Sequence, residues 1–312
     1  MAATPDIGDG RPHVSLPVIA PRPRFSLALP GGRSLSLGDR PLVMGVLNVT
    51  PDSFADAMPL AGSAAVDAAL AMVAAGADLI DIGGESTRPG SAAVSADEER
   101  RRVEPVVTAL ARQVAVPISV DTTKAAVAAA AIDAGAQLVN DISGLRYDPQ
   151  MANVVATRGV GVVLMHMRGR PADMYREAVY GDVMAEVAEE LGQCVRDAVV
   201  AGVDRGHLVV DPGIGFAKRP EHNYRVLAEL GRLALLGLPV LVGPSRKSFM
   251  AEALDQRPAP DRDWGTAAAV TAAVLGGAHI IRVHAVDAMV QVVRVADAIR
   301  FAADAARPAV PS

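Results

Sequence analysis

The sequence predicts a parallel (β/α)8 barrel, the TIM-barrel architecture, with a β-hairpin before its first long strand. Eight short apolar runs, each typical of a buried strand, end abruptly in polar or charged residues. Alanine-rich helical segments that stop at a glycine separate several of these runs, which indicates βα units and a parallel sheet. Polar residues at nearly every strand end favour a closed barrel, because an open sheet concentrates its site at one switch point.

The expected elements follow one another along the chain. Residues 1–24 are rich in proline and glycine and are expected to form a disordered extension. Phe25–Leu29 and Leu35–Leu37 alternate around Pro30–Gly32, which predicts a hairpin suited to plug one end of the barrel. The predicted strands are Val43–Leu47, Leu79–Ile82, Ile118–Val120, Leu138–Val139, Val160–Met165, Leu208–Val210, Val240–Val242 and Ile280–Ile281.

The predicted helices are those that alanine content and helical spacing support. They are Ala64–Ala75, Ala125–Ala134, Glu186–Ala201 and Thr266–Leu275, each followed by glycine, and a last helix at Val286–Ala303. Gly76, Gly135, Gly202 and Gly276 should take the left-handed conformation that ends a helix. We expect one domain over residues 25–306 and a short tail at residues 307–312.

Composition excludes several classes of protein. The net charge of −5 argues against a nucleic-acid surface, and no apolar run is long enough to cross a membrane. The N-terminal residues lack a signal-peptide pattern, so we expect a cytoplasmic protein. Cys194 is the only cysteine, which excludes an internal disulfide and predicts a small buried apolar side chain.

Two strand-ending carboxylates indicate a binding site inside the barrel. Asp121 and Asp211 each close an apolar strand, and a buried carboxylate needs a cation or hydrogen-bond donors. Asn140 adds an amide, and Lys247 follows the seventh strand in a Ser-Arg-Lys-Ser turn. Together these groups suit a flat heterocycle that resembles guanidine. A salt bridge inside the barrel, for example between a carboxylate and Lys247, is the structural alternative.

Other strand ends suit an anion. The loop of residues 83–91 places hydroxyl groups and Arg88 among glycines, and Arg282 and His284 share one face of the last strand. A structural Arg–Glu pair is the alternative for Arg282. His166 ends the fifth strand within an apolar run, so we interpret it as part of a pocket wall and not as a catalyst.

Seven motifs in register resemble dihydropteroate synthase, over about residues 41–286. They are Asn48–Phe54, Asp81–Gly90, Asp121-Thr122, Asn140–Gly144, Asp211–Phe216, Ser245–Ser248 and Arg282–His284. The resemblance implies a (β/α)8 barrel of folate biosynthesis. It also implies that 6-hydroxymethyl-7,8-dihydropterin pyrophosphate condenses with 4-aminobenzoate to give 7,8-dihydropteroate and pyrophosphate, with Mg²⁺ as cofactor.

The resemblance also assigns roles to individual residues. The catalytic residues implied are Asp121, Lys247 and Arg282. The pterin would contact Asp121, Asn140, Asp211, Phe216, Lys247 and Arg282. The pyrophosphate would contact Asn48, Arg88, Arg282 and His284. The 4-aminobenzoate, with which sulfonamides compete in this family, would contact Phe54, Thr87, Arg88, Pro89 and Ser248. Asn48 would also ligate Mg²⁺, and the family predicts a homodimer formed through late helices.

Three other functions stay open at the level of sequence. A folate-dependent methyltransferase of the same superfamily shares the barrel and the Asp–Asn–Asp set, but the loop at Thr87-Arg88 and the turn at Ser245–Ser248 speak against it. A Schiff-base aldolase would use Lys247. A non-catalytic pterin-binding relative is the third, because Ala55, Ala57 and Ala285 depart from the family pattern.

Overall fold

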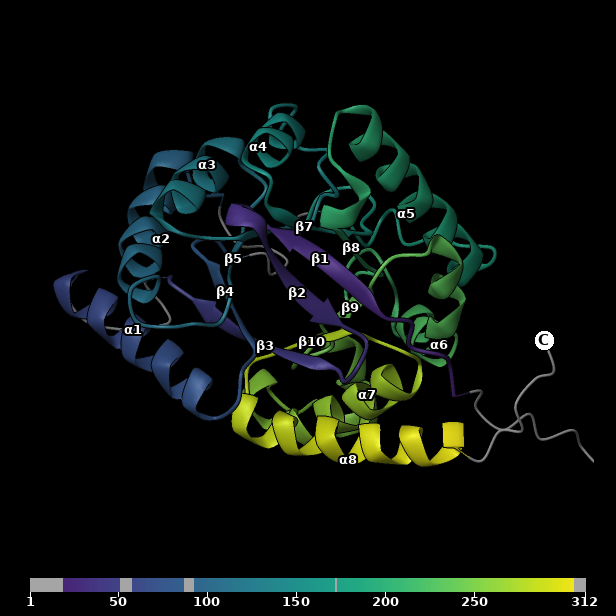
Figure 1. The fold of residues 1–312 in the computed structure, drawn as a ribbon. Coiled ribbons are helices and arrows are strands. Elements are labelled where there is room, and N and C mark those ends of the chain that lie inside the picture. The colour runs from purple at the N-terminus through teal and green to yellow at the C-terminus, as the bar shows by residue number, and fades with distance from the viewer. Residues whose placement is uncertain (1–18, 51–57, 87–92, 172, 306–312) are drawn as a thin grey trace, which may run out of the picture.

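The computed structural model describes residues 19–50, 58–86, 93–171 and 173–305. Eight strands form one parallel sheet in the order β8-β7-β6-β5-β4-β3-β10-β9. A parallel bridge between Val210 and Val240 joins its two edges, so the sheet is a nearly closed barrel with helices around it (Figure 1). The predicted fold class is therefore confirmed.

All eight predicted strands are present, most of them longer by a residue or two at the polar end. They are β3 (Leu42–Asn48), β4 (Leu79–Gly83), β5 (Ile118–Asp121), β6 (Leu138–Asp141), β7 (Gly161–Met165), β8 (Leu208–Asp211), β9 (Leu241–Val242) and β10 (Ile280–Val283). The extension matters, because Asp121, Asp141 and Asp211 lie within the strands and are held by their ladders.

The described helices include the predicted ones and three others. They are α1 (Met58–Ala74), α2 (Ala96–Leu110), α3 (Ala125–Ala134), α4 (Met151–Arg158), α5 (Val183–Val200), α6 (Pro220–Ala228), α7 (Asp263–Leu275) and α8 (Val286–Ala305). The helix α2 was missed because its exposed face is charged and not alanine-rich. Its start is nevertheless well marked, since the Ser95 side chain accepts a hydrogen bond from the Glu98 N–H.

The glycine stops behave as expected with one exception. Gly76, Gly135 and Gly202 have φ values of 101°, 120° and 96°. Gly276 does not, because it ends α7 with φ of −74°, and the next residue, Gly277, takes the left-handed conformation with φ of 91°. The turn is therefore one residue later than predicted.

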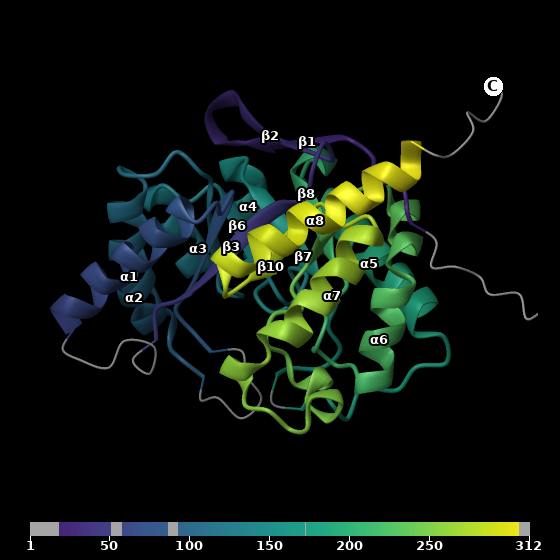
Figure 2. The same ribbon diagram turned by 90° about the horizontal axis from the view of Figure 1, so that it is seen from below.

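The predicted hairpin consists of β1 (Phe25–Leu29) and β2 (Arg33–Leu37), paired antiparallel. It lies across one end of the barrel (Figure 2), and the strands end at the other. Leu27, Leu29 and Leu37 are buried against the interior side chains of the barrel. Because this end is filled by leucine, only the opposite mouth is left for a site.

The strands alternate between two apolar clusters, as a period of two requires. On β4 the side chain of Leu79 points to the barrel axis, whereas those of Ile80 and Ile82 pack against the helices. The same layer of interior apolar side chains is contributed by other strands, at Leu42, Met44, Leu138, Val163, Val209, Leu241 and Ile280. The residue two positions later on each strand is therefore the next inward group toward the mouth.

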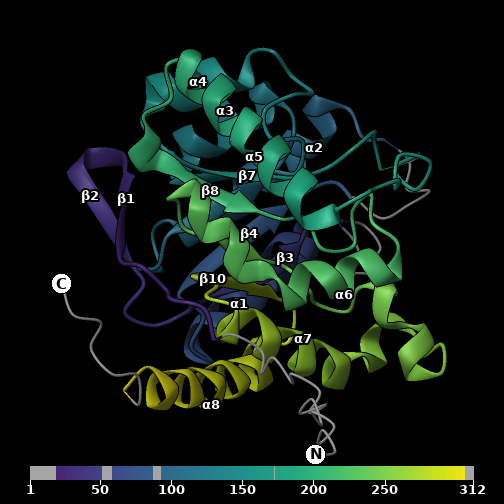
Figure 3. The ribbon, with the colours of Figure 1, turned by 90° about the vertical axis from the view of Figure 1, so that its right-hand side faces the viewer.

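Part of the segment expected to be a disordered extension packs on the barrel. Ala20 and Arg22 are buried, and Arg22 pairs with Asp297 of α8 at 2.6 Å. The segment before the hairpin runs beside α8 (Figure 3). Among the described residues, no helix is long and apolar enough to span a membrane.

Candidate active site

The candidate site is the second inward layer of the barrel, at the mouth opposite the hairpin. It consists of Asp81 on β4, Asp121 on β5, Asn140 on β6, Asp211 on β8 and Arg282 on β10. Four of them follow by two residues an interior leucine, valine or isoleucine of the apolar layer. The alternation that hides those apolar side chains thus also directs the polar ones to a common centre.

Arg282 joins two of these carboxylates. Its Nε donates to Asp81 Oδ2 at 2.6 Å, and its Nη2 donates to Asp121 Oδ2 at 2.6 Å. The Asp81 side chain is fully buried, whereas Arg282 and Asp121 keep 18% and 13% of their side chains exposed. The guanidinium is therefore fixed through two of its nitrogens, Nε and Nη2, while part of the side chain stays exposed. The expected structural pair is present, but with aspartates instead of glutamate.

Asp81 also orients an amide. Its Oδ2 accepts a second hydrogen bond from Asn140 Nδ2 at 2.9 Å. This bond uses one N–H of the Asn140 amide, which leaves its second N–H and its carbonyl oxygen for a ligand. Asp81 belongs to one of the sequence motifs, but no role was predicted for it. It follows the inward-facing Leu79 by two residues, and this spacing was the signal that could have identified it.

Asp211 and Phe216 belong to a glycine turn that follows β8. The carboxylate of Asp211 is buried and accepts a hydrogen bond from the Gly213 N–H at 2.7 Å. Lys247 approaches the same turn, with its Nζ 3.9 Å from the centre of the Phe216 ring. A Cβ at Gly215 would lie 2.9 Å from Lys247 Cδ, so glycine lets the two segments meet. Phe216, Met165 and Ile142 form an apolar wall beside these polar groups.

The charges of the site shift one another's protonation. Burial raises the pKa of Asp121 to about 7; the charge of Arg282 opposes this shift, and the charge of Asp81 adds to it. Burial raises the pKa of Asp211 to about 6, and the Gly213 N–H opposes this. Burial also lowers the pKa of Lys247 to about 8, with help from Arg282. The pKa of Arg282 rises despite its burial, because the carboxylates of Asp81 and Asp121 adjoin it.

The turn that carries Lys247 is anchored to α7. Arg246 has φ of 57° and makes two hydrogen bonds to Asp263, from Nε at 2.7 Å and from Nη2 at 2.8 Å. Its N–H donates to Thr266 Oγ1 at 3.0 Å. Arg246 is thus directed outward, whereas Lys247 points to Phe216. Ser248 is exposed at the start of the short helical turn that follows.

His284 lies one inward position beyond Arg282 on the same strand face. Its Nδ1 lies 2.9 Å from Ser245 Oγ, and its N–H donates to the same oxygen at 3.1 Å. Ser245 is buried, so it ties the end of β10 to the segment after β9. The two alternate side chains expected on this strand are therefore both at the mouth.

Asn48 borders the same space from β3. A Cβ at Gly83 would lie 3.8 Å from Asn48 Oδ1 and 3.8 Å from Asp121 Oδ2. Glycine therefore leaves room between an amide oxygen and a carboxylate oxygen. Among the described residues, no group of three histidine, cysteine or acidic side chains could hold a metal ion. These donors suit an ion that takes most of its oxygen ligands from a substrate, as Mg²⁺ does at phosphate sites.

Four of the assigned residues lie outside the described part of the chain. They are Phe54, Thr87, Arg88 and Pro89. Of the 4-aminobenzoate residues, only Ser248 is described. His166 is buried and hydrogen-bonded, as expected for a wall residue. Cys194 is buried and unpaired, as predicted.

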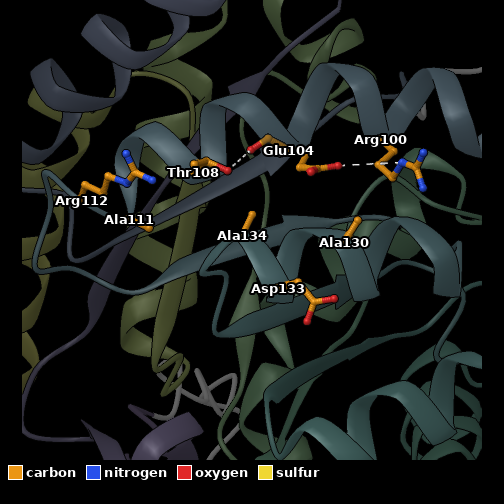
Figure 4. A pocket seen from close by; sticks show the side chains of 8 residues that line it. All are labelled: Arg100, Glu104, Thr108, Ala111, Arg112, Ala130, Asp133 and Ala134. Carbon is orange, nitrogen blue, oxygen red and sulfur yellow. Dashed lines mark hydrogen bonds and ion pairs between the residues drawn. The ribbon is translucent and has the colours of Figure 1, made fainter.

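A surface hollow lies elsewhere (Figure 4). It sits between α2 and α3 and is lined by both charges and small side chains, among them Arg100, Glu104, Arg112 and Asp133. Arg100 pairs with Glu104 along α2, and Asp133 pairs with Arg158 of α4. It contains none of the inward residues of the barrel, so we do not assign the chemistry to it.

The parallel barrel, with its charged layer at the C-terminal ends of the strands, defines the class of α/β-barrel enzymes. A family described as "Pterin binding enzyme" matches residues 44–284 of the chain. The chain belongs to this family.

Individual relatives agree with this assignment. The dihydropteroate synthase of Synechocystis is 46% identical over 277 residues, covering 88% of this chain and 96% of the relative. The structure of Xanthomonas albilineans dihydropteroate synthase with 4-aminobenzoic acid has a TM-score of 0.81 at 45% identity, covering 91% of this chain and 100% of that one. The same enzyme with 7,8-dihydropteroate gives 0.79 at 42% identity, over 92% and 100% of the two chains. These relatives favour the synthase over the methyltransferase and the aldolase.

Proposed function

We propose that the chain is a dihydropteroate synthase. It joins 6-hydroxymethyl-7,8-dihydropterin pyrophosphate to 4-aminobenzoate and releases 7,8-dihydropteroate and pyrophosphate. The observation that carries the proposal is the single inward layer that holds Asp121, Asn140, Asp211 and Arg282 beside Lys247. Relatives with this activity cover most of the chain, and solved relatives hold 4-aminobenzoic acid or 7,8-dihydropteroate.

The pterin fits the layer by its pattern of donors and acceptors. The carboxylate of Asp211 and the carbonyl oxygen of Asn140 accept from ring N–H and amino groups, and Lys247 donates to a ring nitrogen or oxygen. The apolar wall at Phe216 contacts one face of the ring. When the bicyclic ring binds, it displaces water from the mouth. The contacts with these residues replace the hydrogen bonds that the ring made to water.

The reaction breaks the bond between the pterin methylene carbon and the pyrophosphate oxygen, and forms a bond from that carbon to the amine nitrogen. The amine nitrogen then loses a proton. An aromatic amine is neutral at pH 7 and needs no strong base, so positioning and electrostatics supply most of the acceleration. The anionic form of Asp121 stabilises positive charge that develops on the pterin methylene. Arg282 and His284 stabilise the departing pyrophosphate.

Mg²⁺ is part of the proposal. When bound, it would neutralise charge on the leaving pyrophosphate. Asn48 would hold it through its amide oxygen, with pyrophosphate oxygens and water as further ligands, because the protein offers few donors there. The 4-aminobenzoate would contact Phe54, Thr87, Arg88, Pro89 and Ser248. Arg88 would also contact the pyrophosphate.

Two further proposals concern the whole molecule. We expect a homodimer formed through α8, which is supported by the exposed apolar side chains of Val295, Ile299 and Phe301. Light scattering coupled to gel filtration tests it, and an Ile299→Asp variant should shift the mass toward a monomer. We place the protein in the cytoplasm, because its single buried cysteine needs no oxidising compartment.

A pyrophosphate-release assay with the pterin pyrophosphate, 4-aminobenzoate and Mg²⁺ tests the activity. The wild-type protein should turn over, and Lys247→Ala and Asp211→Asn should lose most of the rate while remaining folded by circular dichroism. Arg158→Ala is a matched control, because Arg158 pairs with Asp133 on the outside of the barrel. Full rates in both site variants would show that the assignment of the site is wrong.

A further inference from the structure

Lys218 is the largest of the fully buried side chains in the described part of the chain, with 1% of its surface exposed. It directly follows the glycine turn of Asp211–Ala217. Its ammonium group makes three hydrogen bonds, to His166 Nδ1 at 2.8 Å and to the carbonyl oxygens of Gly213 and Phe216 at 3.2 Å each. An ammonium has three donors, so all of them are used.

The contact to His166 requires one form of the imidazole. Since Lys218 donates to Nδ1, this nitrogen carries no proton, and Nε2–H donates to Glu190 at 3.0 Å. Burial lowers the pKa of His166 to about 3, which agrees with the neutral ring. Glu190 is held in turn by Arg168, whose Nε lies 2.9 Å from its Oε1. Lys218 is thus the inner end of a chain of polar groups that reaches the surface.

The turn in front of Lys218 is conformationally costly. Gly213, Gly215 and Ala217 have φ values of 68°, 80° and 46°, and the last of these is unfavourable for a residue with a Cβ. The turn is also confined on both sides. A Cβ at Gly213 would overlap the carbonyl oxygen of His166, and one at Gly215 would meet the side chain of Lys247.

Several backbone groups of this turn bind side chains. Two of them, the carbonyl oxygens of Gly213 and Phe216, accept from the Lys218 ammonium. The Gly215 N–H donates to Asn223 Oδ1 at 2.6 Å, and the Ala217 carbonyl accepts from Tyr180 Oη at 2.9 Å. The Lys218 carbonyl accepts from Asn223 Nδ2 at 3.1 Å. The ammonium of Lys218 binds the carbonyl oxygens of both Gly213 and Phe216, and so reinforces the span that the Phe216 N–H closes by donating to the Gly213 carbonyl at 3.1 Å.

We propose that Lys218 is a positioning residue for the reaction, which acts by fixing the glycine turn that presents Asp211 and Phe216 to the pterin. The inference rests on the proposed function. Lys218 itself is fully buried and its three donors bind His166 and the turn, so it acts through the turn and not on the substrate. Without its ammonium, the carbonyl groups of Gly213 and Phe216 lose a common partner, and the turn relaxes away from the conformation that the pterin requires.

The electrostatics of the buried amine are consistent with this role. Burial lowers the pKa of Lys218 to about 7, and the charges of Asp211 and Glu190 oppose this effect. Met has a similar length, but it leaves the acceptors at His166 Nδ1, Gly213 and Phe216 without the amine donor, which destabilises the protein. We therefore expect Lys218→Met to fold with a lower stability than the wild type, with its structural change in the turn.

Hydrogen exchange and kinetics together test the proposal. In Lys218→Met, the amide protons of Gly213, Gly215 and Phe216 should exchange at least about tenfold faster, and those of β4 should be unchanged. The value of kcat/KM for the pterin pyrophosphate should fall about 10–100-fold, with a parallel loss of affinity for a non-reactive pterin. Lys218→Gln, which keeps an amino donor but no charge, should recover part of both.

The control is Arg300→Met, which removes another buried cation. Arg300 lies on α8 and bonds to the Ala20 carbonyl, at the hairpin end of the barrel. It should leave exchange in the turn and kcat/KM unchanged. If Lys218→Met keeps the wild-type exchange of the turn, or the wild-type affinity for the pterin, Lys218 is only structural.

Each failure has its own signature. If the wild-type protein does not turn over, the proposed function fails, whatever the variants do. If it turns over and Lys218→Met matches it, only the positioning role fails. Should Lys218→Met not fold, the comparison passes to Lys218→Gln, where an unchanged kcat/KM together with wild-type exchange in the turn would overturn the inference.

Discussion

The guanidinium of Arg282 is held by Asp81, which accepts its Nε–H at 2.6 Å from a fully buried position. The same carboxylate oxygen accepts from Asn140. One buried oxygen on β4 thus sets the direction of a cation on β10 and of an amide on β6. The three strands are alternate members of the run β6-β5-β4-β3-β10, so this relationship depends on the order of strands in the sheet.

Replacement of Asp81 should disturb both partners. Asp81→Asn keeps the size of the side chain but removes the charge beside Arg282, and a hydrogen bond to a charged group contributes about 1.5–3 kcal/mol. We expect kcat/KM to fall about 10–100-fold in the pyrophosphate-release assay. Asp297→Asn is the control, because Asp297 pairs with Arg22 at the hairpin end. An equal loss in both variants would mean that the effect is general destabilisation.

Two glycines separate backbone strain from steric overlap. Gly213 and Gly159 have similar φ values, of 68° and 58°, but a Cβ at Gly159 would meet nothing within 4 Å. Gly159→Ala should lower the free energy of unfolding by about 1–2 kcal/mol and keep full activity. Gly213→Ala should cost about 1–3 kcal/mol more and lose most of the pterin affinity. Chemical denaturation and calorimetric titration with a pterin measure the two effects, and similar results for both variants would contradict the role of the turn.

Asp211 should make stability depend on pH. Burial raises its pKa from 3.8 to about 6, so between these values the folded protein retains a proton that the unfolded chain releases. The contribution of this group to stability is therefore present at low pH and is lost as the pH rises through about 6.

The variant Asp211→Asn isolates this effect, because its amide oxygen can still accept from the Gly213 N–H. Its free energy of unfolding, minus that of the wild type, should increase by up to about 3 kcal/mol from pH 4 to pH 6 and stay constant above. Urea denaturation at several pH values measures the difference. Parallel curves for the two proteins would show that Asp211 has no raised pKa.

The affinity of the protein for Mg²⁺ should depend on the presence of pyrophosphate. With Asn48 as the main protein donor, calorimetric titration of the protein alone should give weak Mg²⁺ binding, and inorganic pyrophosphate should strengthen it. Asn48→Ala should remove most of the difference. Tight binding of Mg²⁺ without pyrophosphate would contradict the proposed site.

The sequence by itself determined the barrel and the strands that bear its polar groups. Each strand is an apolar run with a polar residue after it, a local pattern with a period of two, so Asp121, Asn140, Asp211 and Arg282 could be assigned to one mouth. The turn glycines and the hairpin were local signals of the same kind. The helix α2 lacked such a signal, because its exposed face is charged.

Only the tertiary structure decided which of these groups are partners. Asp81 and Arg282 are 201 positions apart, and Lys218 meets His166 across 52 positions. No local pattern encodes such pairs, because they arise from the register of strands around a closed barrel. A lysine in a polar turn is usually exposed, and it is burial behind the glycine turn that gives Lys218 its three partners.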